Sequence, residues 1–498
     1  MQDRETGWGF AGVVAALYLA FLIWMHLHHE LWRDEAHAWS LARIAHGFGD
    51  LVTGDRRYEG HPPLWFWYLR VWSWIVPAAW GLQVATIAAA LGAALLWLRF
   101  APFPRLLRVL LLATYYFGYE YTVMCRNYVL GWLMLCVFCT LYHPLRVRVL
   151  RLTAVLVLLA WTSVYGLVIA LGLVLFLALE QVRLRGGTSE RRQLVMVALP
   201  RQLLGLAIFA AAVWFFAWSV EPPDPNPFSP GWNFAALNPD ALPSVVTRVV
   251  DGMLPLRPFR IDFWHRWLAY WDRFPAATPY LAAGCLAAAA AVLYRSWRLL
   301  CFYLVSVLLM VVVQVARYGG SPRHWGHFFM ALIAASWLLR TLSPRRRHLP
   351  SLLLLLVLCG VQVQSFLAAT AMDTRYPFSG GRDAAAYIRS AGMLDWPLVA
   401  GPGQALTVAV YLRRPFYNME TEEVEETVAF HARRKNFSAP ELVTRAIGVS
   451  REQHRPVVVV TGVPLAPVPP GVRARLLYSS PRCTIDDEEF RVYSLDAS

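Results

Sequence analysis

The sequence predicts a polytopic α-helical membrane protein with about eleven transmembrane helices, additional juxtamembrane helices and a small C-terminal α/β domain. Of the 498 residues, 57% are hydrophobic, whereas soluble domains are about 45–50% apolar. Apolar runs of about 17–25 residues, the length that crosses a bilayer, recur over most of the chain. After residue 370 this pattern stops. We therefore divide the chain into a membrane region, 1–370, and a C-terminal domain, 371–498.

Eleven apolar runs are expected to cross the membrane. A further run, 62–77, has about fourteen residues between two prolines and is rich in Trp and Tyr, which favour the membrane interface. It is too short to span comfortably, so we expect a juxtamembrane helix in the outer leaflet. The eleven expected spans are 9–28, 82–98, 106–122, 128–142, 152–164, 167–182, 203–220, 279–294, 299–316, 327–342 and 349–369.

Arginines between the runs indicate the orientation. With a cytoplasmic N-terminus, the five inner loops together hold seventeen Arg and one acid, Glu190. Residues 29–63 and 221–278, on the outer side, hold twelve acids and nine Arg. This bias follows the positive-inside rule, and a full span at 62–77 would reverse it. We thus expect two large periplasmic loops, 29–81 and 221–278, and a periplasmic or extracellular C-terminal domain. The inner loops are 99–108, 143–151, 183–201, 295–298 and 340–348.

The net charge of +14 does not indicate nucleic-acid binding, because the surplus lies in the inner loops. From residue 372 onward, fifteen Lys and Arg balance fifteen Asp and Glu. Arginine is abundant and Lys435 is the single lysine, a composition typical of a high-GC bacterium. The expected location is therefore the bacterial inner (plasma) membrane.

Two adjacent carboxylates, Asp34 and Glu35, directly follow the first span. They begin an amphipathic stretch, on which Trp39, Ile44 and Phe48 are expected to face the membrane. A helix N-terminus favours negative charge and keeps a carboxyl group ionised. The alternative is that either acid simply caps the helix.

The same outer loop brings a further acid and a histidine, Glu59 and His61, in "RRYEGHPPLWFWYL". Three carboxylates and a histidine within one short loop are more than helix capping requires. We therefore expect a functional site at this membrane face.

These residues carry a resemblance to a known family. "RDEAHAWSLA" followed by "YEGHPPLWFWYL" resembles the signature of GT-C superfamily glycosyltransferases, closest to the protein O-mannosyltransferases and aminoarabinose transferases of the glycosyltransferase family 39-like group. "YTVMCRNYVLGWLML" and "RYGGSPRHWGHFFMALIAASWLL" resemble later arginine-containing segments of that group. The resemblance covers about residues 10–370. At "YEGHPP" the chain departs from it, since the aminoarabinose transferases place the acid directly before Lys-Pro.

The resemblance implies a GT-C-like fold and an inverting glycosyltransferase. A site on the outer face has no access to nucleotide sugars, so the implied donor is a sugar on a polyprenyl phosphate. The implied acceptor is an envelope glycan, lipid or protein, and membrane lipids surround the chain. A carboxylate would be the base for the acceptor hydroxyl. Arginines would hold the leaving phosphate.

On this basis we expect Asp34 to be the base, with Glu35 and Glu59 orienting acceptor or donor. The candidate substrate-binding residues are His61, Arg126, Tyr128, Arg317, Arg323, His324 and His265. For the cations among them, the alternative is contact with lipid headgroups.

The second outer loop offers a further aromatic segment. Six aromatic residues and two Arg over 262–274 indicate another interfacial helix that could cover the site. His265 in this segment could join Glu59 in a divalent metal site, but two ligands are too few to predict one. No cofactor is otherwise expected.

A transporter or a flippase for lipid-linked sugars is the alternative function. Ionisable residues would then mark a path through the membrane. Here the charges cluster at span ends, and the two halves of the chain show no repeat of the kind transporters contain.

In the C-terminal domain, strands alternate with helices. Helices are expected at 381–393 and 404–412, and strands near 396–400, 456–462, 473–479 and 489–495. Residues 413–435 carry an acidic block and then a basic block. We expect a solvated helix there, with a binding site as the alternative.

Overall fold

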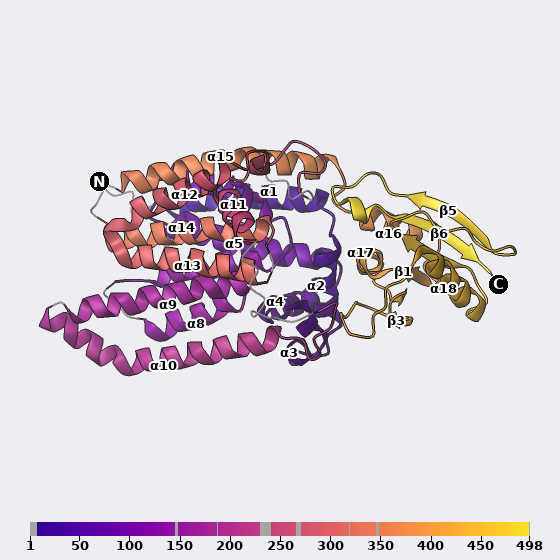
Figure 1. Ribbon diagram of the computed structural model, residues 1–498, viewed down its shortest axis with the longest axis horizontal. Helices are drawn as coiled ribbons and strands as arrows, with labels where there is room; N and C mark the ends of the chain where they lie inside the picture. Colours follow the sequence, from indigo (N-terminus) through magenta and orange to yellow (C-terminus); the bar gives the residue numbers. More distant parts are fainter. Residues whose placement is uncertain are drawn as a thin grey trace.

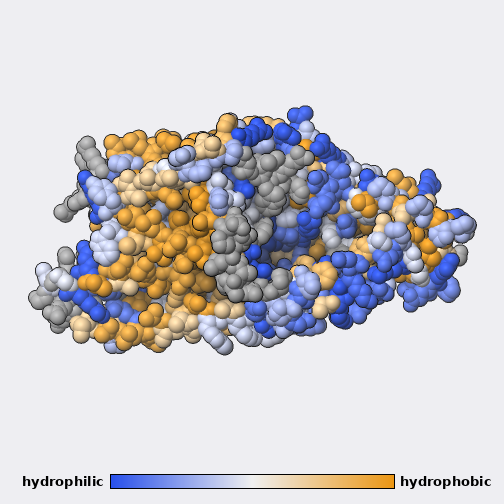
Figure 2. Space-filling view, in the orientation of Figure 1, coloured by the Kyte–Doolittle hydropathy of each residue, from blue (hydrophilic) through white to orange (hydrophobic). Residues whose placement is uncertain are grey.

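A helical bundle at one end and a small mixed domain at the other make up the molecule (Figure 1). The computed structural model describes residues 7–144, 148–186, 188–229, 241–264, 270–317, 319–344 and 348–497. On the face shown in Figure 2, hydrophobic residues cover much of the bundle, and hydrophilic residues gather over the C-terminal domain and the adjoining bundle end. This distribution is that of a multi-pass membrane protein.

Each expected span coincides with helical structure. Within the part of the chain that the structure describes, six helical stretches are long and apolar enough to cross a bilayer, so the count of eleven stays a prediction. Those six are α1 (Trp8–His28), α5 (Trp80–Phe100), α9 (Val164–Arg185), Ala198–Val220 within α10 (Ser189–Val220), Thr278–Ala316, and α15 (Leu349–Arg375). The stretch Thr278–Ala316 comprises α12 (Thr278–Leu293), the 3-10 turn η5 (Tyr294–Ser296) and α13 (Trp297–Ala316). The shorter or more polar helices are α7 (Tyr128–Leu141), α8 (Val149–Ala160), α11 (Leu242–Met253) and α14 (Pro322–Leu342).

The expected span 106–122 is not one helix. It consists of α6 (Arg105–Leu112) and a separate π-helical turn, η2 (Tyr115–Glu120). Thr114 starts the turn as its cap, because its side chain accepts a hydrogen bond from the Phe117 N–H. Gly118 allows α15 to pack closely, since a Cβ there would lie 2.7 Å from the ring of Phe366.

The first expected outer loop forms a layer of short elements at the bundle end that faces the C-terminal domain (Figure 1). The expectation that Trp39 faces the membrane is wrong. Its side chain is 1% exposed, because its helix packs between α4 (Leu64–Ile75) and the C-terminal domain. Phe48, in contrast, is 42% exposed. The short elements of this layer are α2 (Arg33–Ile44), α3 (Asp50–Thr53), η1 (Asp55–Glu59) and α4 (Leu64–Ile75).

The C-terminal domain is a six-stranded mixed sheet in the order β3-β2-β1-β4-β6-β5. The expected helices and strands are present. β1 (Leu398–Ala400) pairs in parallel with β2 (Phe416–Asn418) and β4 (Val457–Thr461). The antiparallel strands are β3 (Glu423–Glu425), β5 (Arg473–Ser479) and β6 (Arg491–Asp496), and the helices are α16 (Gly381–Ser390), α17 (Pro402–Leu412) and α18 (Ala439–Glu452).

The solvated helix expected over 413–435 does not form. This stretch contains β2 and β3 and continues as irregular chain to residue 438. Phe416 is buried in the sheet, and Arg434 folds back to form an ion pair with Glu420. Burial of the apolar residues at β2 and this long-range ion pair outweigh local helix formation. We call residues 427–434 the covering segment, because they lie over the site described next.

Candidate active site

A cavity of about 480 Å³ opens at the bundle end, beneath the covering segment. Eight of the residues expected from the sequence line it, and they come from five separate stretches of the chain. They are Asp34, Glu59, His61, Arg126, Tyr128, Arg317, Arg323 and His324. The fold thus gathers one carboxylate of α2 with the cations at the ends of other helices.

Asp34 lies between two arginines. Its Oδ2 is 3.3 Å from an Nη2 of Arg323 and 3.9 Å from an Nη2 of Arg126. Arg126 also donates Nη1–H to the Asp34 carbonyl oxygen over 2.7 Å. Burial alone would raise the pKa of Asp34, but Arg126 and Arg323 outweigh it and lower the pKa below its ordinary value. The carboxylate is therefore ionised, and its side chain is still 33% exposed.

Arg126 is held by neutral and backbone partners rather than by a close carboxylate. Its Nη2 donates to His61 Nε2 over 3.3 Å. Burial, with Arg126 as the next cause, lowers the pKa of His61 to about 4, so this ring is neutral. Among the described residues, Nε of Arg126 has no hydrogen-bond partner although it is buried. Arg126 therefore keeps capacity for an anionic ligand.

A second pair, His37 and Glu59, lies in the same cavity. His37 Nδ1 is 3.2 Å from Glu59 Oε1, and Nε2 is 2.7 Å from the Val428 carbonyl oxygen. Both partners are acceptors, which favours a proton on each ring nitrogen. Burial would lower the pKa of His37, but Glu59 outweighs it and raises it. His37 in turn helps lower the pKa of Glu59, against burial.

Tyr128 and His324 form the wall nearest the bundle. The Ser321 N–H donates to His324 Nδ1 over 2.9 Å, so the ring proton is on Nε2. That Nε2–H lies 2.8 Å from the Tyr128 hydroxyl oxygen. The ring of Tyr165, also in the wall, stacks on His324 at 5.0 Å. This side is neutral and aromatic, which suits the apolar face of a bound ligand.

Glu35 is absent from the lining of the cavity. It accepts hydrogen bonds from the Trp32 N–H (3.2 Å) and the Cys125 N–H (2.5 Å). The first contact is the helix-capping alternative considered above. The second holds the backbone next to Arg126. Glu35 therefore positions the site without facing it.

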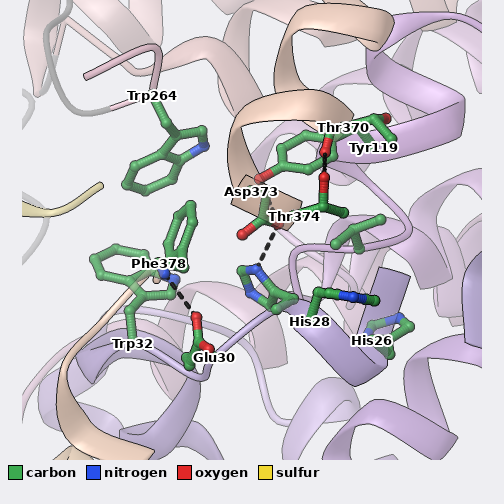
Figure 3. Close-up of polar contacts among 12 residues, drawn as sticks. His26, His28, Glu30, Trp32, Tyr119, Trp264, Thr370, Asp373, Thr374 and Phe378 are labelled. Carbon is green, nitrogen blue, oxygen red and sulfur yellow. Dashed lines mark hydrogen bonds and ion pairs between the residues drawn. The ribbon is translucent and has the colours of Figure 1, made fainter. Parts of the chain in front are cut away.

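Glu35 belongs to a closed cluster around His29. Figure 3 shows two further members of this cluster, Asp373 and Tyr119. His29 Nδ1 lies 2.9 Å from Asp373 Oδ2, and Nε2 lies 3.3 Å from Glu35 Oε2. Burial would lower the pKa of His29, but Asp373 and Glu35 outweigh it and raise it well above its ordinary value. Tyr119 donates its hydroxyl to Asp373 over 2.9 Å. The cluster ties α1, α2 and α15 together.

A smaller cavity of about 230 Å³ lies on the other side of Asp34, against the C-terminal domain. Asp34, His37 and Phe430 line both cavities. Arg434 lines the smaller one with its guanidinium group 4.5 Å from the ring centre of Phe430. Its side chain is 8% exposed, and among the described residues its Nη1 has no hydrogen-bond partner. Asp34 thus stands at the junction of two cavities.

His265, the remaining candidate, lies outside the described residues, as do its neighbours to 269. The segment 262–274, expected as an interfacial helix, ends in the 3-10 helix η4 (Tyr270–Arg273). Within the described ranges, no three His, Cys, Asp or Glu side chains lie close enough together to hold a metal ion.

Sequence reasoning missed two groups of residues. His37 was detectable, since it follows Asp34 by three positions and therefore shares its helix face. Phe430 and Arg434 had no such signal, because only the tertiary fold brings the C-terminal domain to the site. Tyr165, in the cavity wall, also lay outside every motif.

The fold as a whole is similar to that of a solved structure, ArnT from Cupriavidus metallidurans in the apo state. The two share 13% sequence identity and a TM-score of 0.54 over 98% of each chain. No family model and no curated protein matches the sequence. The expectation of an ArnT-like fold for this chain is thereby confirmed.

Proposed function

We propose that the protein is an inverting glycosyltransferase that moves a sugar from a polyprenyl-phosphate donor to an acceptor of the bacterial cell envelope. The observation that carries the proposal is the position of Asp34, an ionised and accessible carboxylate at the junction of two cavities. Transfer requires this arrangement, because donor and acceptor must reach one base from different sides.

The larger cavity suits the donor. Within the described lining, three arginines (Arg126, Arg317 and Arg323) and His37 stand against two carboxylates, Asp34 and Glu59, which gives a surplus of positive charge there. A lipid phosphate would neutralise this surplus. Arginine binds phosphate oxygens through paired N–H groups, and the unpartnered Nε of Arg126 is available for one of them.

The smaller cavity suits the acceptor. Its charges are close to balance, because Arg33 pairs with Asp487 and Arg434 pairs with Glu420. Phe430 offers an apolar surface, and Nη1 of Arg434 offers a donor without a partner in the described chain. An uncharged acceptor rich in hydroxyl groups fits such a surface, so we favour an envelope glycan over a charged acceptor.

The reaction then takes one displacement step. Asp34 accepts the proton of the acceptor hydroxyl while the acceptor oxygen attacks the anomeric carbon. The bond between that carbon and the phosphate oxygen breaks, and polyprenyl phosphate leaves with the electron pair. Arg126 and Arg323 stabilise the charge that develops on the phosphate. Attack from the opposite side inverts the anomeric centre.

Donor binding also activates the base. In the empty site Arg126 and Arg323 lower the pKa of Asp34, which makes it a weak base. A bound phosphate competes for the same guanidinium groups, and its negative charge raises the pKa of Asp34. The carboxylate therefore becomes a stronger base only when donor is present, which limits idle turnover.

Orientation is part of the proposal: the site faces the periplasm and the N-terminus lies in the cytoplasm. The arginine bias of the expected inner loops supports it. A phosphatase fused after Leu495 should be active in the periplasm. Activity at that position from a cytoplasmic reporter alone would overturn the orientation.

The test of function uses the full chain in lipid nanodiscs with a radiolabelled polyprenyl-phosphate sugar and envelope glycan fragments. We expect release of polyprenyl phosphate together with a labelled glycan of inverted configuration. Asp34→Asn should stop both. Movement of intact donor across proteoliposomes, with no cleavage under any condition, would instead support the flippase alternative.

A further inference from the structure

A third cavity, of about 300 Å³, lies at the end of the bundle away from the site. The ends of α9, α12, α13, α14 and α15 and the turn η5 enclose it. Its apolar part includes Val292, Leu339 and Leu342. Neither the proposed reaction nor the fold comparison assigns it a role.

Its charge is positive. Arg183 and Arg298 both pair with Glu180, at 3.1 and 2.9 Å. Arg295 donates its Nε–H to the Tyr294 hydroxyl over 2.7 Å, which is a neutral partner. Three guanidinium groups against one carboxylate leave a surplus of two positive charges, so the cavity attracts an anion.

Three buried polar atoms in the lining lack partners. Within the described ranges, Nη1 of Arg298 and the hydroxyl groups of Ser296 and Ser351 make no hydrogen bond. These residues are 9%, 7% and 2% exposed. A buried polar group without a partner is destabilising, because it has lost its hydrogen bonds to water. Three such groups in one cationic cavity indicate a ligand with several acceptor oxygens.

The rim places this ligand at the membrane surface. Tyr294 and Trp297 flank the cavity and are 58% and 52% exposed. Exposed Tyr and Trp at helix ends favour the level of the lipid headgroups. We propose that the cavity binds a phosphate group, that of an anionic phospholipid, with its acyl chains along the apolar helices.

The bound lipid would join the helices that enclose the cavity, at the end opposite the site. Arg298 and Arg295 hold the phosphate oxygens, and Ser296 and Ser351 donate their hydroxyl groups to it. The acyl chains extend from the apolar side of the cavity. The lipid therefore stabilises the bundle as a ligand that binds only the folded state.

The experiment measures thermal unfolding of the full chain in nanodiscs and lipid retention by native mass spectrometry. The arms are phosphatidylglycerol, phosphatidylcholine, and phosphatidylcholine with inorganic phosphate. We expect the highest unfolding temperature and a retained lipid with phosphatidylglycerol. An equal rise with inorganic phosphate would overturn the lipid as the source. Identical behaviour in all three arms would overturn the site.

Matched variants locate the effect. Arg295→Ala should weaken phosphatidylglycerol retention about tenfold, the loss of one charged hydrogen bond. Arg105→Ala is the control, because Arg105 is exposed and outside the cavity lining. Arg105 begins α6, just after Pro102, whose carbonyl oxygen accepts a hydrogen bond from Arg340 near the end of α14. The control residue is therefore near the same end of the bundle. Equal losses in both variants would reduce the effect to general surface charge and overturn the proposal.

A third variant should change stability and lipid retention in opposite directions. Ser351→Ala removes a buried hydroxyl group that lacks a partner, so it should raise stability in phosphatidylcholine. The same change should lower retention of phosphatidylglycerol. Lower stability in phosphatidylcholine would show that the hydroxyl already has a partner and would contradict its role as a ligand donor.

Discussion

Asp34 and Glu35 are neighbours in the chain but lie in two different surroundings. They are about 100° apart on one helix. Asp34 is 33% exposed between two cavities. Glu35 is fully buried in the cluster of His29 and Asp373, which we call the closed region. The surroundings of Asp34, which we call the open region, have surplus positive charge and an unpartnered Arg126 Nε among the described residues.

The surroundings of Asp34 serve the proposed reaction, whereas the surroundings of Glu35 serve the stability of the fold. In the open region, charge and hydrogen-bonding capacity remain available to a ligand, as a site for transfer requires. In the closed region, a histidine cation lies between two carboxylates without access to solvent. The closed region also holds the backbone at Cys125, next to Arg126. The stable cluster therefore sets the geometry of the reactive one.

The largest expected effect follows from Asp34→Asn. Asparagine keeps the size of the side chain but cannot accept the proton, so the rate of transfer should fall about 10²–10⁴-fold. Thermal unfolding should change little, because the side chain is partly exposed. A rate within a few-fold of wild type, with Glu59→Gln inactive, would assign the base to the other carboxylate.

Glu35→Gln should affect stability instead. Removing one charge from a buried pair typically costs about 3–5 kcal/mol. We expect a clearly lower unfolding temperature with measurable transfer per folded molecule. Wild-type stability together with complete loss of transfer would show that Glu35 acts in the reaction and would contradict its structural role.

Arg126→Lys tests the phosphate contact. Lysine keeps the charge but loses the planar pair of N–H groups. The KM for the lipid donor should rise about tenfold to a hundredfold, with a smaller change in the KM for acceptor. An unchanged donor KM in both Arg126→Lys and Arg323→Ala would remove the arginines from donor binding.

Two adjacent arginines test the smaller cavity. Arg434 lines it, whereas Arg433 is 64% exposed and pairs with Glu423. Arg434→Ala should raise the KM for a neutral glycan acceptor about tenfold, and Arg433→Ala should leave it unchanged. Failure of the wild-type protein to cleave donor would count against the proposed function itself. Equal behaviour of the two variants would count only against the acceptor cavity.

The smallest effect is expected from pH. The pKa values of Asp34 and Glu59 are lowered, and that of His37 is raised above 6.5. Transfer should therefore be constant from about pH 5 to the raised pKa of His37 and fall a few-fold above it. His37→Gln should remove this decline. The stability from the His37–Glu59 pair is likewise present below pH 6.5 and lost as the pH rises through the folded pKa.

Local patterns in the sequence predicted most of the elements. Apolar runs and arginine-rich loops located the helices, and alternation located the strands of the C-terminal domain. Three predictions differ from the structure where long-range packing prevailed. Trp39 is buried instead of facing the membrane. The span 106–122 contains a capped break at Thr114, and residues 413–435 join a sheet instead of forming a helix.

The features of the site also divide into those that the sequence predicted and those that only the tertiary structure decided. The sequence by itself determined that acids and cations gather at one membrane face, because the ends of neighbouring spans meet there. Only the tertiary structure decided that Asp34, and not Glu35, faces the cavities. It also brought Val428 and Arg434 over α2 from some 390 positions away in the chain. The physical reason is that helix periodicity fixes only the angle between two side chains, whereas packing of distant elements decides which one meets solvent.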